Sequence, residues 1–254
     1  MRQVAAITFV TVREVLRRKV QVNLLLFGSL VILASLMISR LTIGEQHRIL
    51  SDLGLSAATA IGTLIAVFVG SSLVAGDIER RVLQPVVAKP ATRTQYLLGR
   101  YLGLSVALVL NLALMAVVLA GVLCIEAESL RPLDASLLAA LLMLGLQLLV
   151  VAAVAILFSS VTSTTLAAIF TLALAVAGHL TSEARALWQG ESSTWIPKAI
   201  WYAVPNLTAL SLNGAVIYHK PVPASAWTAA LYGALYAAAA LALASLSFER
   251  RDLR

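Results

Sequence analysis

Long apolar runs separated by short polar segments form the pattern of this chain. A helix that crosses the apolar core of a bilayer, about 30 Å thick, needs about 20 apolar residues. The runs that meet this requirement are Val22–Ser39, Leu53–Ala75, Tyr101–Ile125, Leu137–Phe158, Val161–Leu180 and Trp227–Phe248, and none contains Asp, Glu, Lys or Arg. Apolar residues are continuous along them and do not alternate with a period of two, which disfavours barrel strands. The pattern predicts an all-α integral membrane protein with six transmembrane helices.

Composition supports this prediction. Hydrophobic residues make up 60% of the chain and charged residues 12%, and the mean hydropathy is +0.92. Soluble domains are about 45–50% apolar and about 25% charged. These values exclude a soluble enzyme, a disordered regulator and a secreted disulfide scaffold. The one cysteine, Cys124, lies inside an apolar run, so the sequence indicates neither an intrachain disulfide nor a metal cluster.

The distribution of Lys and Arg predicts the orientation of the spans. If the N-terminus is cytoplasmic, the inside segments are 1–21, 76–100, 159–160 and 249–254, and they hold 13 of the Lys and Arg residues. The outside segments hold the other 6. Cytoplasmic loops of membrane proteins carry the excess of Lys and Arg. We therefore expect a multi-pass protein of the cell (inner) membrane with both termini in the cytoplasm. Anionic lipid on that face explains the net charge of +7 better than nucleic acid does.

Residues 1–21 differ from a cleavable signal peptide, because a charged cluster separates a mildly apolar stretch from the first span. On a helical wheel one side gathers Phe9, Val12, Val15 and Leu16, and the other gathers Arg13, Glu14, Arg17 and Arg18. This pattern predicts an interfacial helix that enters the first span through an elbow. An ordinary basic anchor before the span is the alternative.

Two long connections interrupt the spans. Residues 76–100 form a charged cytoplasmic segment, and residues 181–226 form an external segment rich in aromatic side chains. Ser193 and Asn206 are placed to cap two short helices, with Gly214 ending the second. We expect these helices to be re-entrant or interfacial ones before the last span. No fixed-period repeat or low-complexity linker is visible, so residues 1–254 are predicted to form a single transmembrane domain.

The sequence carries few groups suited to catalysis. It contains no GxxxxGK[ST], HExxH, CxxC or GxSxG pattern, so no phosphate loop, zinc site or serine nucleophile is expected. We expect His47, His179 and His219 to be ordinary polar residues at helix ends. The most polar residues inside the spans are Asn111 and Gln147, which either bond across helices or line a polar path; helix packing is favoured. The spans hold no ionisable groups of the kind that proton relays need.

The segment from Asp77 to Gly99 combines acidic and basic residues on short helical stretches. A loop that served only to keep positive charge in the cytoplasm or to attract anionic lipid would gain nothing from acidic residues. A protein partner of complementary charge accounts for both signs, whereas a plain basic loop remains the alternative.

This segment resembles the first cytoplasmic loop of ABC-2 type transporter permeases, most closely the permeases of copper-site maturation systems. The external YAVPNL stretch and the C-terminal FERRDL are also similar to that family, whereas Arg81 departs from it, where glycine is expected in many members. The loop residues that carry the resemblance are Glu79, Val82, Leu83, Lys89, Pro90, Arg93, Tyr96, Leu97, Leu98, Gly99 and Arg100.

The resemblance implies the membrane subunit of an ATP-driven transporter. Its expected partners are two copies of an ABC ATP-binding subunit, a second permease copy and membrane lipids; the chain itself would hold no cofactor, since ATP and Mg²⁺ would bind the partner subunit. Gly99 and Gly103 would let one helix pack closely on another. The residues that would couple to the ATPase are Glu79, Arg80, Arg81, Pro85, Lys89, Pro90 and Arg93.

Two other functions stay open at this point. A secondary carrier or channel would work without an ATPase, and an intramembrane enzyme would need polar groups that converge at one depth. An ABC ATPase gene beside this one would favour the transporter. The substrate does not follow from the sequence.

Overall fold

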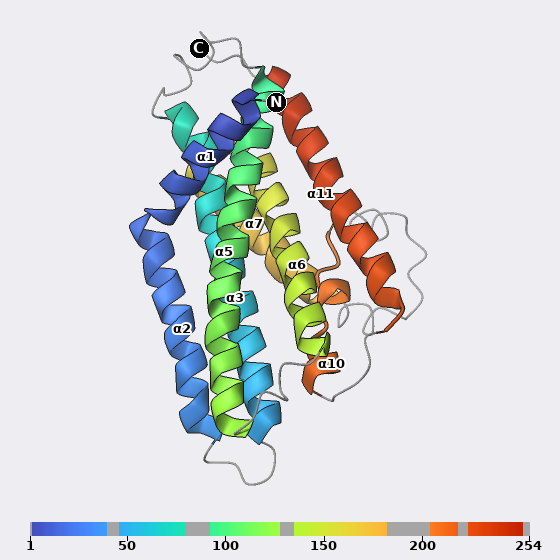
Figure 1. The fold of residues 1–254 in the computed structure, drawn as a ribbon. Coiled ribbons are helices and arrows are strands. Elements are labelled where there is room, and N and C mark those ends of the chain that lie inside the picture. Colours follow the sequence, from blue (N-terminus) through green and yellow to red (C-terminus); the bar gives the residue numbers. More distant parts are fainter. Residues whose placement is uncertain are drawn as a thin grey trace.

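A computed structural model describes residues 2–39, 46–79, 92–127, 135–181, 204–217 and 223–250. Within these ranges the chain forms a bundle of long helices, and no strand occurs in them. Figure 1 shows the N-terminus at the same end of the bundle as the last turn of the C-terminal helix. The first and the last described helices therefore begin and end, respectively, on one side of the bundle.

Among the described residues, five helices are long and apolar enough to cross a membrane. They are α2 (Lys19–Ser39), α3 (Gln46–Glu79), α5 (Arg93–Ala127), α6 (Ala135–Val161) and α11 (Ser225–Arg250). A sixth apolar helix, α7 (Thr164–His179), has 16 residues and covers about 24 Å. Helix α1 (Arg2–Leu16) precedes α2, and the short η1 (Thr208–Leu210) and α10 (Asn213–Ile217) precede α11.

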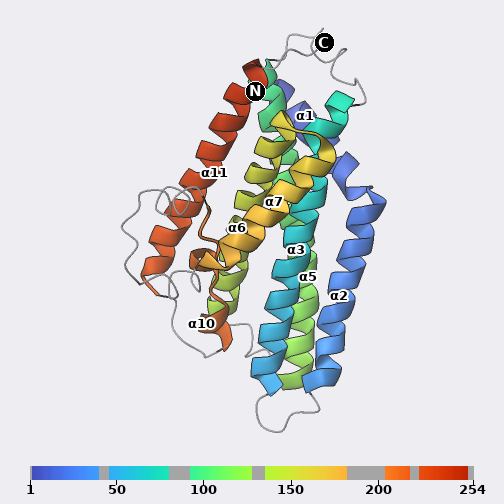
Figure 2. The same ribbon diagram turned by 180° about the vertical axis from the view of Figure 1, so that it is seen from behind.

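Helix α3 lies at the centre of the bundle and packs against α2, α5, α6 and α7 (Figure 2). It is the most buried of the long helices, whereas α2 and α11 leave most of their apolar side chains exposed. An exposed apolar surface of this kind is what a bilayer solvates. Helix α3 therefore contributes the largest share of the buried core.

The expected elbow lies between α1 and α2. Helix α1 ends at Leu16 and α2 begins at Lys19, with the amide of Arg18 donating to the carbonyl of Val15 over 3.0 Å. The break is thus a tight turn at residues 17–18, and it separates the amphipathic α1 from the uniformly apolar α2.

The start of α5 follows from local sequence. Thr92 and Gln95 bond reciprocally: each side chain pairs with the other residue's backbone amide at 3.3 Å. This is a capping box, in which two amides at a helix start receive partners. Helix α5 therefore begins at Arg93.

The corner between α6 and α7 differs from the prediction of a span over Val161–Leu180. Val161 still belongs to α6, because the amide and hydroxyl of Thr162 both donate to the carbonyl of Phe158, at 2.9 and 2.8 Å. Helix α7 begins only at Thr164. The last turn of α6 thus includes Val161, which the apolar pattern assigned to the next span.

The segment after Pro205 folds back on α7. The amide of Leu207 donates to the carbonyl of Gly178 over 3.1 Å, and Asn206 Oδ1 accepts the amide of Ala209 at the start of η1 over 3.1 Å. The prediction that Gly214 ends a helix was wrong. Gly214 is the second residue of α10, because the amides of the next two residues both turn back to the carbonyl of Leu212. The predicted cap Ser193 lies outside the described residues.

Candidate functional site at the charged end of the bundle

The apolar runs of three helices end at one level. The run in α3 ends at Ala75, that in α5 begins at Tyr101, and that in α6 ends at Phe158. The amide of Ala75 donates to Ser159 Oγ over 2.8 Å, and Asp77 pairs with Arg100. Because these contacts align the three ends, they mark one boundary of the apolar zone, and charged side chains gather just beyond it.

Arg100 is the centre of this charged cluster. Its guanidinium pairs with Asp77 of α3 and, over 2.5 Å, with Glu14 of α1. Its Nε donates to the hydroxyl of Tyr96, one turn earlier in α5, over 3.2 Å. The side chain of Arg100 is only 10% exposed. A single buried cation thus joins three helices.

The remaining members make the cluster electrically neutral. Arg18 pairs with Glu14 over 2.6 Å and also bonds to the hydroxyl of Ser72. The Tyr96 hydroxyl donates to Asp77. Two cations and two carboxylates therefore face one another, the arrangement that buried charges require, because an unpaired charge at such a position is costly.

Glu14 shows the electrostatic effect of this pairing. Partial burial would by itself raise the pKa of its carboxyl. The hydrogen bonds and positive charges of Arg100 and Arg18 outweigh burial and lower that pKa below its ordinary value. Glu14 therefore stays ionised at neutral pH, and α1 is tied to α5 by a charged contact.

A serine on α6 bonds to both partners of one backbone pair in α3. Ser159 Oγ donates to the carbonyl of Ser71 over 2.7 Å and accepts the amide of Ala75 over 2.8 Å. These two backbone groups are four residues apart, so a regular helix would pair them with each other. A side chain placed in such a pair is a known cause of helix bending. The last turns of α3 are thus held by α6.

Two of the predicted coupling residues flank the segment 80–91. Glu79, the last residue of α3, accepts the backbone amide of Thr164 at the start of α7 over 3.0 Å, a favourable place for a negative charge. Arg93, the first residue of α5, donates to the carbonyls of Phe248 and Glu249 in α11, at 3.2 and 3.0 Å. The other predicted coupling residues, Arg80, Arg81, Pro85, Lys89 and Pro90, lie outside the described residues.

Gly99 and Gly103 lie under α1. A Cβ atom added at Gly99 would be 2.7 Å from Ile7 Cγ2, and one added at Gly103 would be 2.4 Å from Thr11 Cβ. Separations this short are not tolerated by carbon atoms. The two glycines therefore allow α1 to lie directly against the backbone of α5, beside the contacts of Arg100.

The two intramembrane amides each meet a polar side chain of another helix. Gln21 Nε2 of α2 donates to Asn111 Oδ1 over 3.3 Å. Gln147 Nε2 lies 2.6 Å from His179 Nε2. His179 Nδ1 is 2.8 Å from the carbonyl of Ala175, which can only accept, so Nδ1 donates and Nε2 accepts from Gln147. His179 is thus an interhelical partner rather than the plain polar residue at a helix end that we expected.

Sequence reasoning did not single out Asp77 and Glu14 as functional, and it assigned Arg100 only to a motif. A signal was present for Asp77 and Arg100, since each is a charged residue close to the edge of an apolar run. Among the described residues, no group of three or more His, Cys, Asp or Glu side chains is arranged to hold a metal ion. The cluster instead joins α1, α3 and α5 through paired charges.

Comparison with known proteins gives one match. A family model described as "ABC-2 family transporter protein" matches residues 18–253. The match begins at the elbow and includes Asp77, Arg100 and the segment between them. The search among individual curated proteins found no match.

Proposed function

The chain belongs to the ABC-2 family of transporter proteins, and we propose that it is the permease subunit of a transporter driven by ATP hydrolysis on separate ABC ATP-binding subunits. Its apolar helices and its family make it a multi-pass membrane transport protein. The partner subunits, present in two copies, would supply the ATP and Mg²⁺ sites. A second permease copy would complete the path for a substrate.

The ion pair between Asp77 and Arg100 is the observation that supports this proposal. Asp77 lies three residues before residue 80 and Arg100 nine residues after residue 91, so the pair joins the two ends of the segment that would meet the ATPase. The same Arg100 holds Glu14 of α1. A displacement of the segment would therefore reach α3, α5 and α1 together.

We further propose that the charged end of the bundle is cytoplasmic and that α7 is a sixth crossing of the inner membrane. Helix α7 by itself is shorter than the apolar core of a bilayer. The segment around η1, bonded to Gly178 near the end of α7, would fill the remaining depth as a re-entrant element. The excess of Lys and Arg at the charged end supports the orientation.

The partnership can be tested by co-expressing the tagged permease with each candidate ABC ATP-binding subunit of the same organism. We expect the two to purify together from membranes, and we expect ATP hydrolysis from the complex but not from the permease alone. Solute transport by the permease alone, driven by an ion gradient, would contradict the proposal.

Glu79 gives a sharper test of the contact, because two substitutions separate its two roles. Glu79→Gln keeps an oxygen that can accept the Thr164 amide but removes the charge, whereas Glu79→Lys removes both. If the charge meets the ATPase, both variants lose co-purification, since truncating one partner of a desolvated charge pair costs about 2–5 kcal/mol. If Glu79 only caps α7, Glu79→Gln behaves like the wild type. Asp52→Asn, an exposed carboxylate at the opposite end of α3, is the matched control.

A further inference from the structure

A histidine connects the end of α7 to α6. His179 is the last residue of α7 and is half-buried, whereas its partner Gln147 on α6 is 1% exposed. His179 Nε2 lies 2.6 Å from Gln147 Nε2. The other ring nitrogen, His179 Nδ1, lies 2.8 Å from the carbonyl oxygen of Ala175, one turn earlier in α7. Each nitrogen of the imidazole therefore has a defined neighbour.

These neighbours decide where a second proton binds to the ring. The carbonyl of Ala175 can only accept, so Nδ1 carries a proton in the neutral imidazole and keeps it in the cation. The second proton then binds at Nε2, the atom that accepts from Gln147. In the cation two donors would face each other, the N–H group at Nε2 and the NH2 group of Gln147. The bond between α7 and α6 in its present arrangement therefore requires the neutral imidazole.

The charged side chains of the elements packed against α7 lie far from this bond. Neither α6 nor residues 204–217 contain a titratable side chain, and α7 contains no second one. Leu148, the neighbour of Gln147, packs on Gly62 of α3. At the helical rise of about 1.5 Å per residue, the charges of α3 begin about 15 Å from that level on one side and about 22 Å on the other. The titratable side chains of α3 lie in its end turns and are His47, Arg48, Asp52, Asp77 and Glu79.

A cation at His179 would therefore favour water over its present partner. A charge without a counterion is costly next to a buried neutral group. The half-buried ring can turn outward, whereas the buried Gln147 cannot follow it. The last carbonyls of a helix are a favourable place for a positive charge, so the end of α7 can carry the cation once it has left α6. Protonation thus favours separation of the two helices at this point.

The last turn of α7 also holds the segment that follows Pro205. The amide of Leu207 donates to the carbonyl of Gly178 over 3.1 Å. The hydroxyl of Thr181 lies 3.0 Å from Asn206 Oδ1. The amide of Asn206 donates over 3.0 Å to the hydroxyl of Tyr232, the titratable group that α11 presents to this segment. A shift of the end of α7 would therefore reach residues 206–207 and, through them, α11.

We propose that His179 and Gln147 form a pH-sensitive latch between α7 and α6. The neutral imidazole holds the last turn of α7 against α6, and protonation at Nε2 by water releases that turn together with residues 205–208. In the orientation proposed above, this end of α7 faces the outside, so the latch would respond to external pH. Only the side of the membrane rests on the proposed function, since the latch itself needs neither an ATPase nor a substrate.

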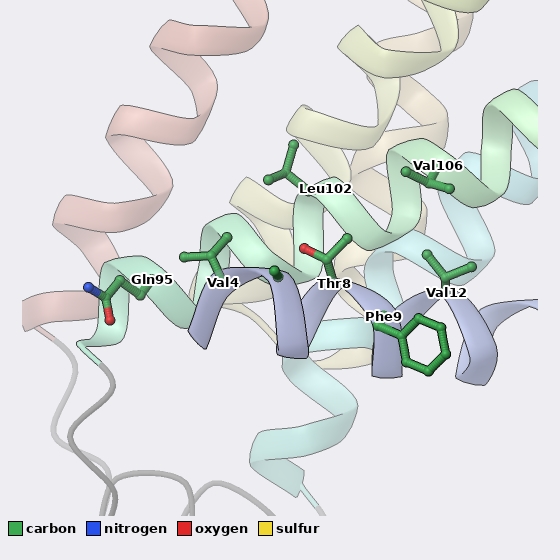
Figure 3. A pocket seen from close by; sticks show the side chains of 8 residues that line it. Val4, Thr8, Phe9, Val12, Gln95, Leu102 and Val106 are labelled. Atoms are coloured by element: carbon green, nitrogen blue, oxygen red, sulfur yellow. The ribbon is translucent and has the colours of Figure 1, made fainter. Parts of the chain in front are cut away.

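The groove between α1 and α5 provides an internal reference, because no side chain that lines it is titratable. Figure 3 shows Val4 and Phe9 of α1 beside Leu102 and Val106 of α5 in this groove. Amide exchange in these two helices should therefore not respond to the charge of a histidine.

Hydrogen exchange of the full chain in lipid vesicles, followed by mass spectrometry and corrected for the intrinsic effect of pH, tests the release. Imidazole changes its charge between about pH 8 and pH 5. Over that range we expect exchange at the end of α7 and in residues 205–209 to rise about five-fold, as for the loss of one ordinary hydrogen bond. Peptides from the two helices of Figure 3 should not change.

Three variants separate the latch from other effects of pH. His179→Asn cannot be protonated and should lose the pH dependence, whereas His47→Asn, at the start of α3, should keep it. Gln147→Met removes the partner and should exchange rapidly at both pH values. An equal response to pH in the wild type and in His179→Asn, or an unchanged rate in the wild type, would overturn the proposal.

Nitrogen NMR of histidine-labelled protein tests the proton positions directly. At pH 8 we expect His179 to carry its proton on Nδ1 and none on Nε2, and near pH 5 we expect both nitrogens to be protonated. A proton on Nε2 at pH 8, or a ring that stays neutral near pH 5, would refute the latch. Both measurements use the permease alone, so their failure would leave the proposed transport function standing.

Discussion

Replacing Arg100 with methionine isolates the contribution of the charged cluster, because methionine keeps an apolar stem and removes the charge. Asp77, whose side chain is 13% exposed, then keeps only the Tyr96 hydroxyl as a partner from the cluster. Glu14 is 36% exposed and keeps Arg18. The loss of stability therefore comes mainly from Asp77, whose charge is left with a single partner, and the loss of the Glu14 contact adds little to it.

The size of the effect follows from this difference. Removing one partner of a buried pair costs about 3–5 kcal/mol, because the other charge is left without compensation. Asp77 retains one hydrogen bond, so we expect the lower end, about 3 kcal/mol of unfolding free energy. The same change at Arg18, in a half-exposed pair with Glu14, should cost under about 1 kcal/mol.

The assay is equilibrium unfolding of the purified chain in mixed micelles, followed by circular dichroism. The double variant Asp77→Asn/Arg100→Met removes both charges, so we expect it to be more stable than the sum of the single effects predicts, by about 2 kcal/mol. Additive single effects, or equal losses for Arg100→Met and Arg18→Met, would refute the view that Asp77 and Arg100 form one buried pair.

Three further outcomes follow from the described contacts. Ser159→Ala leaves the backbone groups of α3 to pair with each other and should cost about 1 kcal/mol in the same unfolding assay, while Ser105→Ala, whose hydroxyl bonds only within α5, should be neutral. Gly103→Val should destabilise by about 1–3 kcal/mol through overpacking against α1, whereas Gly121→Val meets open space and should not. Folding lowers the pKa of Glu14 from 4.5. The contribution of its charge to the free energy of unfolding is therefore complete above about pH 4.5 and is lost as the pH falls through the folded pKa. The unfolding curves of wild type and Glu14→Gln should therefore converge in acid.

The helices of this protein could be predicted because bilayer-length apolar runs leave few alternatives. The limits of single elements were less predictable where polar side chains decide them. Thr162 extends α6 by bonding to Phe158, and the carbonyl of Leu212 starts the helix in which Gly214 lies. Neither bond leaves a trace in the hydropathy of the sequence.

The charged cluster shows a different limit. The position of Arg100 next to an apolar run could be read from the sequence, but its partners could not, since Glu14 is 86 residues away along the chain and Asp77 is 23. The spacing of Gly99 and Gly103 likewise predicted close packing without indicating α1 as the helix that they contact. Tertiary topology, which a single sequence does not display, decides which charges meet.

The contacts at the two ends of the segment 80–91 differ in strength, and this bears on how movement would spread. The pair of Asp77 with Arg100 is buried, so separating it exposes charges to a poor environment. The bonds of Glu79 to α7 and of Arg93 to Glu249 of α11 lie at the surface, where water replaces a lost hydrogen bond at little cost. A force on the segment would therefore displace α3, α5 and α1 as one unit, while the ends of α7 and α11 separate from it and bond again. Such a division into a rigid part and reversibly attached helices would fit the ATP-driven permease proposed above.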